Sequence, residues 1–108
     1  GEQCRDFVHV QDVAGAFVQA MDAEVTGETF NVGTGIPVSV NSVFHSVRQA
    51  MGLSLAARYV PAVPGELRYS VADIGRAQKA LGYKPTHSFD SSVGQVVEEI
   101  LSAAETRV

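Results

Sequence analysis

The stretch RDFVHVQDVAGAF (5–17) decides the fold, because it joins an alternating, β-rich run to a helical repeat. The run at 6–10 predicts a short strand, and Asp12 after it is a candidate N-cap. From there apolar residues recur at helical spacing and predict an amphipathic helix of about three turns: Val13, Ala16, Phe17 and Ala20. A strand that leads directly into such a helix is typical of an α/β layer.

The middle of the chain repeats this strand-to-helix pattern. Residues 29–32 are β-rich and predict a second strand, which ends at the glycine-containing turn 33–35. A second helix is predicted over 40–51, where apolar residues recur at i, i+3, i+4, i+7 and i+11. Either Ser39 or Asn41 can cap its first turn.

The last third of the chain carries one more short strand and two helices. Residues 58–60 predict the strand, and Asp73 and Gly82 bracket a helix over 74–81 as its cap and its left-handed stop. A wide apolar stripe predicts the final helix, over about 93–104. The order β-α-β-α-β-α-α predicts an α/β fold with short strands and about four helices.

Length and composition indicate one domain over residues 1–108, since 45% of the residues are hydrophobic, enough for a core. The net charge is −4 and the eight Lys and Arg residues are scattered, so no nucleic-acid partner is expected. Cys4 is the only cysteine, and no Cys/His ligand spacing occurs, which argues against a disulfide or a metal site and favours the cytoplasm. No apolar run approaches the ~20 residues of a membrane helix, so no membrane partner is expected. Because the sequence starts at Gly1 without methionine, we expect further sequence upstream.

The turn Asn31-Val32-Gly33-Thr34-Gly35 lies between a predicted strand and a predicted helix. Its backbone N–H groups and the following helix N-terminus could receive an anion. The glycine spacing and the acidic residue of a dinucleotide loop are both missing, so a plain tight turn is the favoured interpretation. The sequence therefore predicts no cofactor-binding residue here.

Acid/base and nucleophilic candidates are few. His9, His45 and His87 have no serine, cysteine or carboxylate at a spacing that indicates a triad or a paired-carboxylate site. We expect His9 to line its strand and the other two histidines to be solvated at the surface. Cys4 has Arg5 beside it but no base, so an inert thiol is favoured. No catalytic residue is predicted.

Arg5 is the more interesting cation, because a guanidinium just before a strand can bind a phosphate through two hydrogen bonds. Phe7 would then supply an apolar or stacking surface two residues along the strand. The alternative is a surface ion pair of Arg5 with Asp6 or Asp12, and the residues alone leave the two interpretations even.

A second charged group lies on the loop Pro64-Gly65-Glu66-Leu67-Arg68. Its carboxylate suits ribose hydroxyls and its guanidinium suits a phosphate. The alternative, an exposed loop with its own salt bridge, is slightly favoured on the residues alone.

Four separated motifs, in order, resemble those of the extended short-chain dehydrogenase/reductases: RDFVHV (5–10) with Asp12-Val13-Ala14, FNVGTG (30–35), Pro64-Gly65-Glu66, and Ala72-Asp73-Ile74 with LGYKP (81–85). The likeness is to the NAD-dependent nucleotide-sugar epimerases and dehydratases of the UDP-glucose 4-epimerase type. It implies the carboxyl-terminal part of a protein about three times longer, whose earlier Rossmann part holds the glycine-rich NAD loop and a Tyr-x-x-x-Lys pair.

Neither of those two catalytic features is present in this chain. Tyr59, Tyr69 and Tyr83 are its only tyrosines, and none is followed by lysine four positions on. The resemblance therefore implies NAD for the full-length family and no cofactor bound by this chain itself.

The resemblance implies five substrate-binding residues: Arg5 for the nucleotide diphosphate, Phe7 at the family's aromatic position, Val40 near the base, Glu66 at the ribose, and Arg68 as a second phosphate ligand. Arg68 is named because the family often has an arginine at the position of Val63. Phe7 stands where tyrosine is common, which removes one hydroxyl donor. For Val40 a plain core position in the second helix is an even alternative.

Three functions follow as hypotheses. The first is the nucleotide-sugar-binding portion of an epimerase/dehydratase, incompetent alone and active with a Rossmann portion. The second is a stand-alone, non-catalytic binding or oligomerisation module, for which exposed helix faces predict a homo-oligomer. The third is a remnant that binds nothing.

Overall fold

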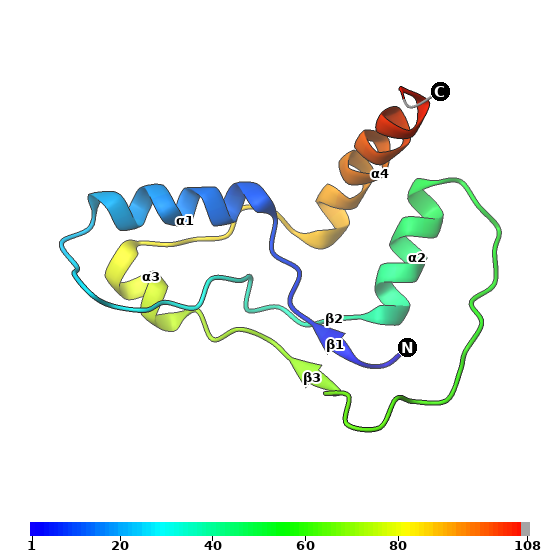
Figure 1. Ribbon diagram of the computed structural model, residues 1–108, viewed down its shortest axis with the longest axis horizontal. Helices are drawn as coiled ribbons and strands as arrows, with labels where there is room; N and C mark the ends of the chain where they lie inside the picture. The colour runs from blue at the N-terminus through cyan, green and yellow to red at the C-terminus, as the bar shows by residue number, and fades with distance from the viewer. Residues whose placement is uncertain (107–108) are drawn as a thin grey trace.

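The computed structural model describes residues 1–106, which form four helices and a very small three-stranded sheet (Figure 1). The elements in chain order are β1 (Cys4–Arg5), α1 (Val10–Asp22), β2 (Val38–Ser39), α2 (Val40–Ala50), β3 (Tyr69–Ser70), α3 (Gly75–Leu81) and α4 (Phe89–Glu105). The predicted α/β class with short strands and about four helices is confirmed.

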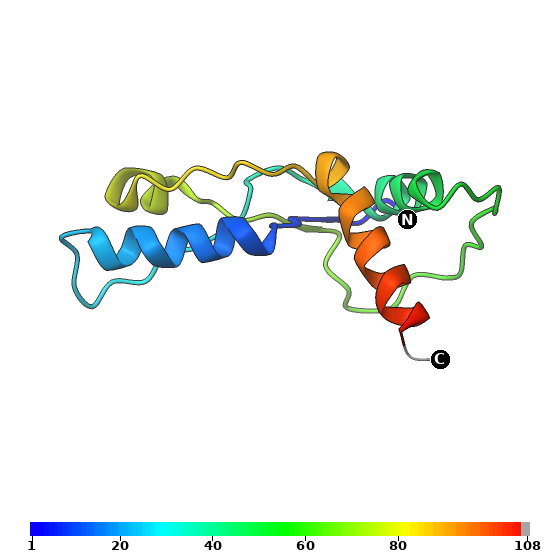
Figure 2. The same cartoon turned by 90° about the horizontal axis from the view of Figure 1, so that it is seen from above.

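The sheet has the order β2-β1-β3, so β1 is its central strand. β1 runs antiparallel to β2, with Cys4 opposite Ser39, and parallel to β3, with Cys4 opposite Tyr69. α1 and α3 lie together at one end of the molecule, and α2 and α4 lie at the other (Figure 1). The result is a flat layer of 50 × 39 × 22 Å, from which the far end of α4 projects (Figure 2).

The strand predicted at 6–10 and its cap are wrong. The strand ends at Arg5, and His9 is the N-cap of α1, since its Nδ1 accepts the Gln11 N–H at 3.0 Å. Asp12, the predicted cap, lies inside the first turn and is buried.

The strands predicted at 29–32 and 58–60 are not strands either. Phe30 and Val32 pack against the core instead of pairing with a neighbour, and residues 58–60 belong to a long exposed loop. β-Propensity reports how well a side chain fits a half-buried pleated surface, and here the pairing strands lie elsewhere, at 38–39 and 69–70.

The predicted ends of the helices agree with the structure better than the predicted strands do. Ser39, rather than Asn41, caps α2, because its Oγ accepts the Ser42 N–H at 3.1 Å. Gly82 ends α3 with a φ of 67°, as predicted. Asp73 does accept the Gly75 N–H at 2.9 Å, although the N-cap position itself falls at Ile74.

α4 starts at residue 89, four residues earlier than the apolar stripe predicts, because Ser88 and Ser91 form a reciprocal capping box there. Local hydrogen bonding thus extended this helix beyond its apolar face.

A small core lies between α1 and α3. Its buried members are Ala16, Ile74, Ala77 and Tyr83. The hydroxyl of Tyr83 donates to the Gly33 carbonyl at 2.6 Å. Burial, and then the nearby carboxylates of Asp12 and Asp6, raise the pKa of Tyr83.

Tyr83→Phe removes this buried hydrogen bond and leaves the Gly33 carbonyl without its donor. We expect a loss of about 1 kcal/mol in the free energy of unfolding. Urea unfolding followed by circular dichroism measures it. Tyr69→Phe is the control, because Tyr69 is 64% exposed; an equal loss in both variants would contradict the role given to the Tyr83 hydroxyl.

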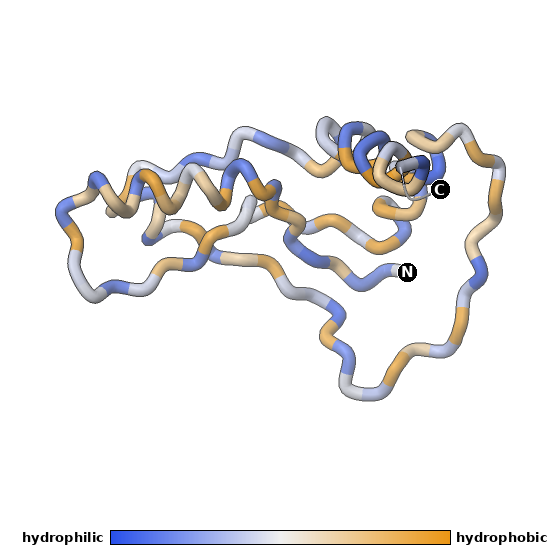
Figure 3. Tube along the Cα trace, turned by 45° about the horizontal axis from the view of Figure 1, so that its top comes forward, coloured by the Kyte–Doolittle hydropathy of each residue, from blue (hydrophilic) through white to orange (hydrophobic). Residues whose placement is uncertain are grey.

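The chain leaves much apolar surface uncovered. Its accessible surface is 8121 Å², whereas a compact monomer of the same mass exposes about 5,800 Å². Its radius of gyration is 16.9 Å, against about 13 Å for a compact domain of this length. Figure 3 shows apolar segments recurring along α1 and along the 53–68 loop.

The clearest uncovered surface is a line of side chains on α1, which we call the α1 stripe: Val10, Ala14, Phe17 and Met21. Phe17 is 71% exposed and Met21 83% exposed. Of the apolar face predicted for this helix only Ala16 is buried, whereas Phe17 points outward. The carboxylate of Asp12 is buried on the same side of α1 as Ala16, so the core side of this helix carries a charged residue and a small one, and its largest apolar side chains are exposed.

Candidate functional site

A surface pocket lies between the start of α2, residues 1–3 and the loop that precedes β3. Its volume is about 930 Å³. We call it the loop pocket, and its lining comprises Gly1, Glu2, Gln3, Val40, Asn41, Phe44, residues 56–63, Glu66, Leu67 and Arg68.

Charged side chains gather at one part of this pocket. The Arg5 guanidinium lies 3.7 Å from the Glu66 carboxylate and also donates to the Cys4 carbonyl at 2.8 Å. Gln3 donates its side-chain amide to the same Glu66 oxygen at 3.4 Å. The ion pair of Arg5 is therefore with Glu66, and the alternatives Asp6 and Asp12 were the wrong partners.

Arg68 pairs with Glu2 at 2.9 Å, and both side chains are 80% exposed. Such exposed pairs are weak, because water screens them and both side chains lose rotamer freedom. The Arg5–Glu66 pair is about one-third exposed on each side. Both arginines can therefore exchange their carboxylate for another anion at little cost.

The structure brings four of the five predicted site residues together and separates the fifth. Val40, Glu66 and Arg68 line the loop pocket, and Arg5 adjoins it through Glu66. Val40 is 38% exposed, so it is not a core residue of α2. Phe7 is not among the lining residues, and its ring packs 5.1 Å from the ring of Phe89.

The turn 31–35 does receive an anion, but the anion is the side chain of Asp6. The Asp6 carboxylate accepts hydrogen bonds from Thr34 N (2.9 Å), Thr34 Oγ1 (2.7 Å), Gly35 N (2.9 Å) and Ala72 N (3.3 Å). Burial alone would raise the pKa of Asp6, but these hydrogen bonds outweigh burial and lower it. The sequence offered no sign of this contact, since 28 residues separate Asp6 from Thr34.

The occupied turn does not fit the pyrophosphate of a dinucleotide. A phosphate there would meet the ionised Asp6 carboxylate. The space is also filled, since a Cβ on Gly33 would lie 2.6 Å from an Asp6 carboxylate oxygen. The turn is a structural brace, in agreement with the plain-turn interpretation of the sequence.

A second buried carboxylate ties the start of α1 to the start of α4. Asp12 accepts from Thr86 N (3.0 Å), Thr86 Oγ1 (2.9 Å) and His87 N (3.0 Å), and its Oδ1 lies 3.0 Å from His87 Nδ1. Burial would raise the pKa of Asp12, but hydrogen bonds from His87 and Thr86 lower it to about 2.

Two of the three histidines, His9 and His87, have surroundings other than those predicted from the sequence. His9 caps α1 and stacks on His87, with ring centroids 4.2 Å apart and an angle of 18° between the planes. His87 is held by Asp12 and is not a free surface group. His45 is exposed as expected, with Nδ1 3.2 Å from Arg48.

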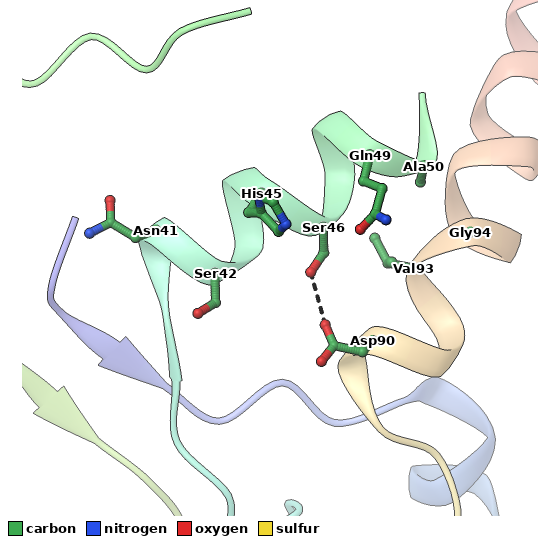
Figure 4. A pocket seen from close by; sticks show the side chains of 9 residues that line it. All are labelled: Asn41, Ser42, His45, Ser46, Gln49, Ala50, Asp90, Val93 and Gly94. Carbon is green, nitrogen blue, oxygen red and sulfur yellow. Dashed lines mark hydrogen bonds between the residues drawn. The ribbon is translucent and has the colours of Figure 1, made fainter. Parts of the chain in front are cut away.

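The second pocket, of about 610 Å³, lies between α2 and α4 (Figure 4). Figure 4 shows Ser46 and Asp90 pointing toward each other across it, and the Ser46 hydroxyl donates to Asp90 at 2.8 Å. Neither an arginine nor a lysine lines this pocket. The loop pocket is the better candidate for an anionic ligand.

Among residues 1–106, no group of three or more His, Cys, Asp or Glu side chains is placed so that it could hold a metal ion. No helix in this part of the chain has the length and apolar character needed to cross a membrane.

A protein-family model described as GDP-mannose 4,6 dehydratase matches residues 1–96. The chain belongs to the NAD-dependent epimerase/dehydratase family. Among the curated members of this family, the UDP-glucose 4-epimerase of Mycolicibacterium smegmatis is 35% identical over 98 residues. That match covers 91% of this chain and 31% of the epimerase, so the chain spans about a third of its relative's length.

Solved structures of epimerase/dehydratase family members share the fold. The UDP-glucose 4-epimerase of Thermotoga maritima, solved with UDP-glucose, matches 96% of this chain and 33% of its own, with a TM-score of 0.88 and 33% identity. A UDP-glucuronic acid 4-epimerase of Bacillus cereus, in complex with UDP-glucuronic acid and NAD, matches 93% of this chain and 33% of its own, with a TM-score of 0.79 and 27% identity. The fold corresponds to the carboxyl-terminal part of these epimerases.

Proposed function

We propose that residues 1–108 form one nucleotide-sugar-binding portion of an NAD-dependent epimerase/dehydratase, which performs no chemistry alone. The observation that carries this proposal is the Arg5–Glu66 pair, 3.7 Å apart, beside a pocket of about 930 Å³. The ligands of the relatives, UDP-glucose and UDP-glucuronic acid, support the choice of ligand.

Ligand binding at this pocket is an exchange of partners. The diphosphate takes the Arg5 guanidinium from Glu66, because a guanidinium binds phosphate oxygens through paired hydrogen bonds. The released Glu66 carboxylate then accepts hydrogen bonds from ribose hydroxyls. Arg68 leaves Glu2 in the same way, and Val40 offers an apolar contact.

Redox and proton-transfer chemistry must come from another portion. NAD would supply hydride transfer when bound there, while this chain has no Tyr-x-x-x-Lys and its one candidate anion turn holds Asp6. The exposed α1 stripe supports docking to a dinucleotide-binding portion, in the same polypeptide or on another. A second copy of this chain is the other candidate partner. The single cysteine supports a cytoplasmic location.

The test is calorimetric titration of the chain with UDP-glucose and, separately, with NAD. We expect saturable binding of UDP-glucose alone, weakened about tenfold by Arg5→Ala, which removes a charge-assisted contact of about 1.5 kcal/mol. The same titrations are repeated in a chimera in which this chain replaces the matching third of the Thermotoga epimerase, so that folding of the isolated chain is not limiting.

Arg76→Ala is the matched control, since Arg76 lies on α3 over the Phe30 ring, away from the loop pocket. Its UDP-glucose affinity should equal that of the unmodified chain. The proposal fails if UDP-glucose does not bind in either context, or if the two arginine variants bind it equally.

A further inference from the structure

The loop between α2 and β3, residues 53–68, has no regular structure of its own. It contains no helix or strand, and it returns from the end of α2 to β3 in a wide arc (Figure 1). Its large apolar side chains are exposed, among them Leu55 at 60% and Val60 at 69%. Yet residues 56–63 of this loop form part of the lining of the loop pocket. The shape of that pocket therefore depends on the contacts that tie the loop to the rest of the chain.

Arg48 supplies one such tie from the last turn of α2. Its Nη1 donates to the Leu55 carbonyl at 2.9 Å, and its own carbonyl accepts the Leu53 N–H at 3.0 Å. Two further contacts hold the guanidinium. Its Nη2 donates to Nδ1 of His45 at 3.2 Å, and its central carbon lies 5.5 Å from the centroid of the Phe44 ring. A planar donor that is fixed in this way loses little further freedom when it binds the loop.

The other side-chain contacts that tie this loop down, within residues 1–106, are made at the pocket itself. Glu66 pairs with Arg5, and the Tyr59 hydroxyl donates to the Asn41 side chain at 2.9 Å. A ligand diphosphate that takes Arg5 would release the first of these ties. Arg48 is not among the residues that line the pocket, so a ligand there leaves its bond to the loop intact.

We propose that Arg48 is a positioning residue for the ligand of the loop pocket. It touches no ligand and acts through the Leu55 carbonyl, which keeps residues 56–63 in place as one wall of the pocket. This inference rests on the proposed function, because the ligand in question is the nucleotide sugar. Without Arg48 the ligand must order the loop as it binds, and that loss of conformational freedom lowers the affinity.

The first test measures how firmly the loop is held when no ligand is present. Trypsin cleaves after arginine, and Arg58 lies within the loop, so the rate of cleavage there reports how often the loop leaves its place. We expect Arg48→Ala to raise this rate about tenfold, since the bond that it removes has a charged donor. Arg48→Lys keeps a cationic donor for the Leu55 carbonyl and should stay within about threefold of the unmodified chain.

Cleavage is measured in the chain and in the Thermotoga chimera, with the cut after Arg58 identified by mass spectrometry. Arg76→Ala is the matched control, because Arg76 also lies 5.5 Å over a phenylalanine ring, that of Phe30, but on α3. It should leave the rate after Arg58 unchanged. Equal rates in the Arg48→Ala and Arg76→Ala variants would overturn the inference, because other contacts would then hold the loop.

The second test is titration of the same variants with UDP-glucose in both contexts. Arg48→Ala should weaken binding about fivefold, since the ligand then has to order the loop. Arg48→Lys should restore most of that loss, a rescue that a general loss of stability would not give. UDP-glucose should also slow cleavage after Arg58 in the unmodified chain, because the bound state holds the loop.

The two tests separate this inference from the proposed function. Faster cleavage of the Arg48→Ala variant without a loss of affinity overturns the positioning role and leaves the proposed function standing. Absence of UDP-glucose binding by the unmodified chain in both contexts overturns the proposed function, and the positioning role of Arg48 with it.

Discussion

Asp6→Ala is expected to remove at least about 3 kcal/mol from the free energy of unfolding, since hydrogen bonds to a charged group contribute about 1.5–3 kcal/mol each. The carboxylate joins three segments, because its donors are on the 31–35 turn and at Ala72. Without it, Thr34 and Gly35 lose the acceptor of their backbone N–H groups. With so small a buried core to compensate, we expect the isolated Asp6→Ala variant to lose the cooperative unfolding transition that the unmodified chain shows.

Urea unfolding of the chain, and the melting temperature of the chimera, measure this effect. Asp73→Ala is the matched control, because Asp73 is exposed and accepts one local bond from Gly75. It should cost about 1 kcal/mol or less. Similar losses in the two variants would show that Asp6 is only a local turn residue.

Asp12→Asn is expected to cost about 2 kcal/mol near neutral pH, because the folded pKa of Asp12 is about 2 against an ordinary 3.8. A depressed carboxyl pKa stabilises the folded state above pH 3.8, and this contribution is lost as the pH falls toward 2. The difference between the unmodified chain and the variant should therefore shrink over that window. Urea unfolding at pH values from 6 down to 2.5 measures it.

Asp22→Asn is the control for this second prediction. Asp22 is an exposed carboxylate in the last turn of the same helix, where a negative charge is unfavourable. Its removal should change the free energy of unfolding by less than about 0.5 kcal/mol. A pH-independent difference for Asp12→Asn would mean that shape, not charge, matters at the Asp12 site.

Helices were predictable from this sequence where a local signal ends them. Ser39 caps α2 and Gly82 ends α3, and each acts within a few residues of its own position. The strands were not predictable, because each has two residues and depends on pairing partners 33 to 65 positions away along the chain. Runs at 29–32 and 58–60 have the composition of strands but meet no partner.

The candidate site, too, was predictable only where a motif named its residues, and not where it depends on contacts between distant parts of the chain. The motif resemblance named Arg5 and Glu66, and the structure brings them together beside one pocket. Phe7 was placed by motif position alone; its ring packs on Phe89, and its part in substrate binding stays a prediction. The contacts of Asp6 and of Asp12 join residues 28 to 75 positions apart, so no spacing rule could have found them.

The central position of β1 has a consequence for biosynthesis. The segment from Cys4 to Asp12 leaves the ribosome before any of its partners, which follow at Thr34, at β2 and β3, and at His87. Native tertiary structure must therefore wait until most of this chain has been translated, and its loops close late. During that interval the apolar side chains of the nascent chain stay exposed, which is the condition under which aggregation competes with folding.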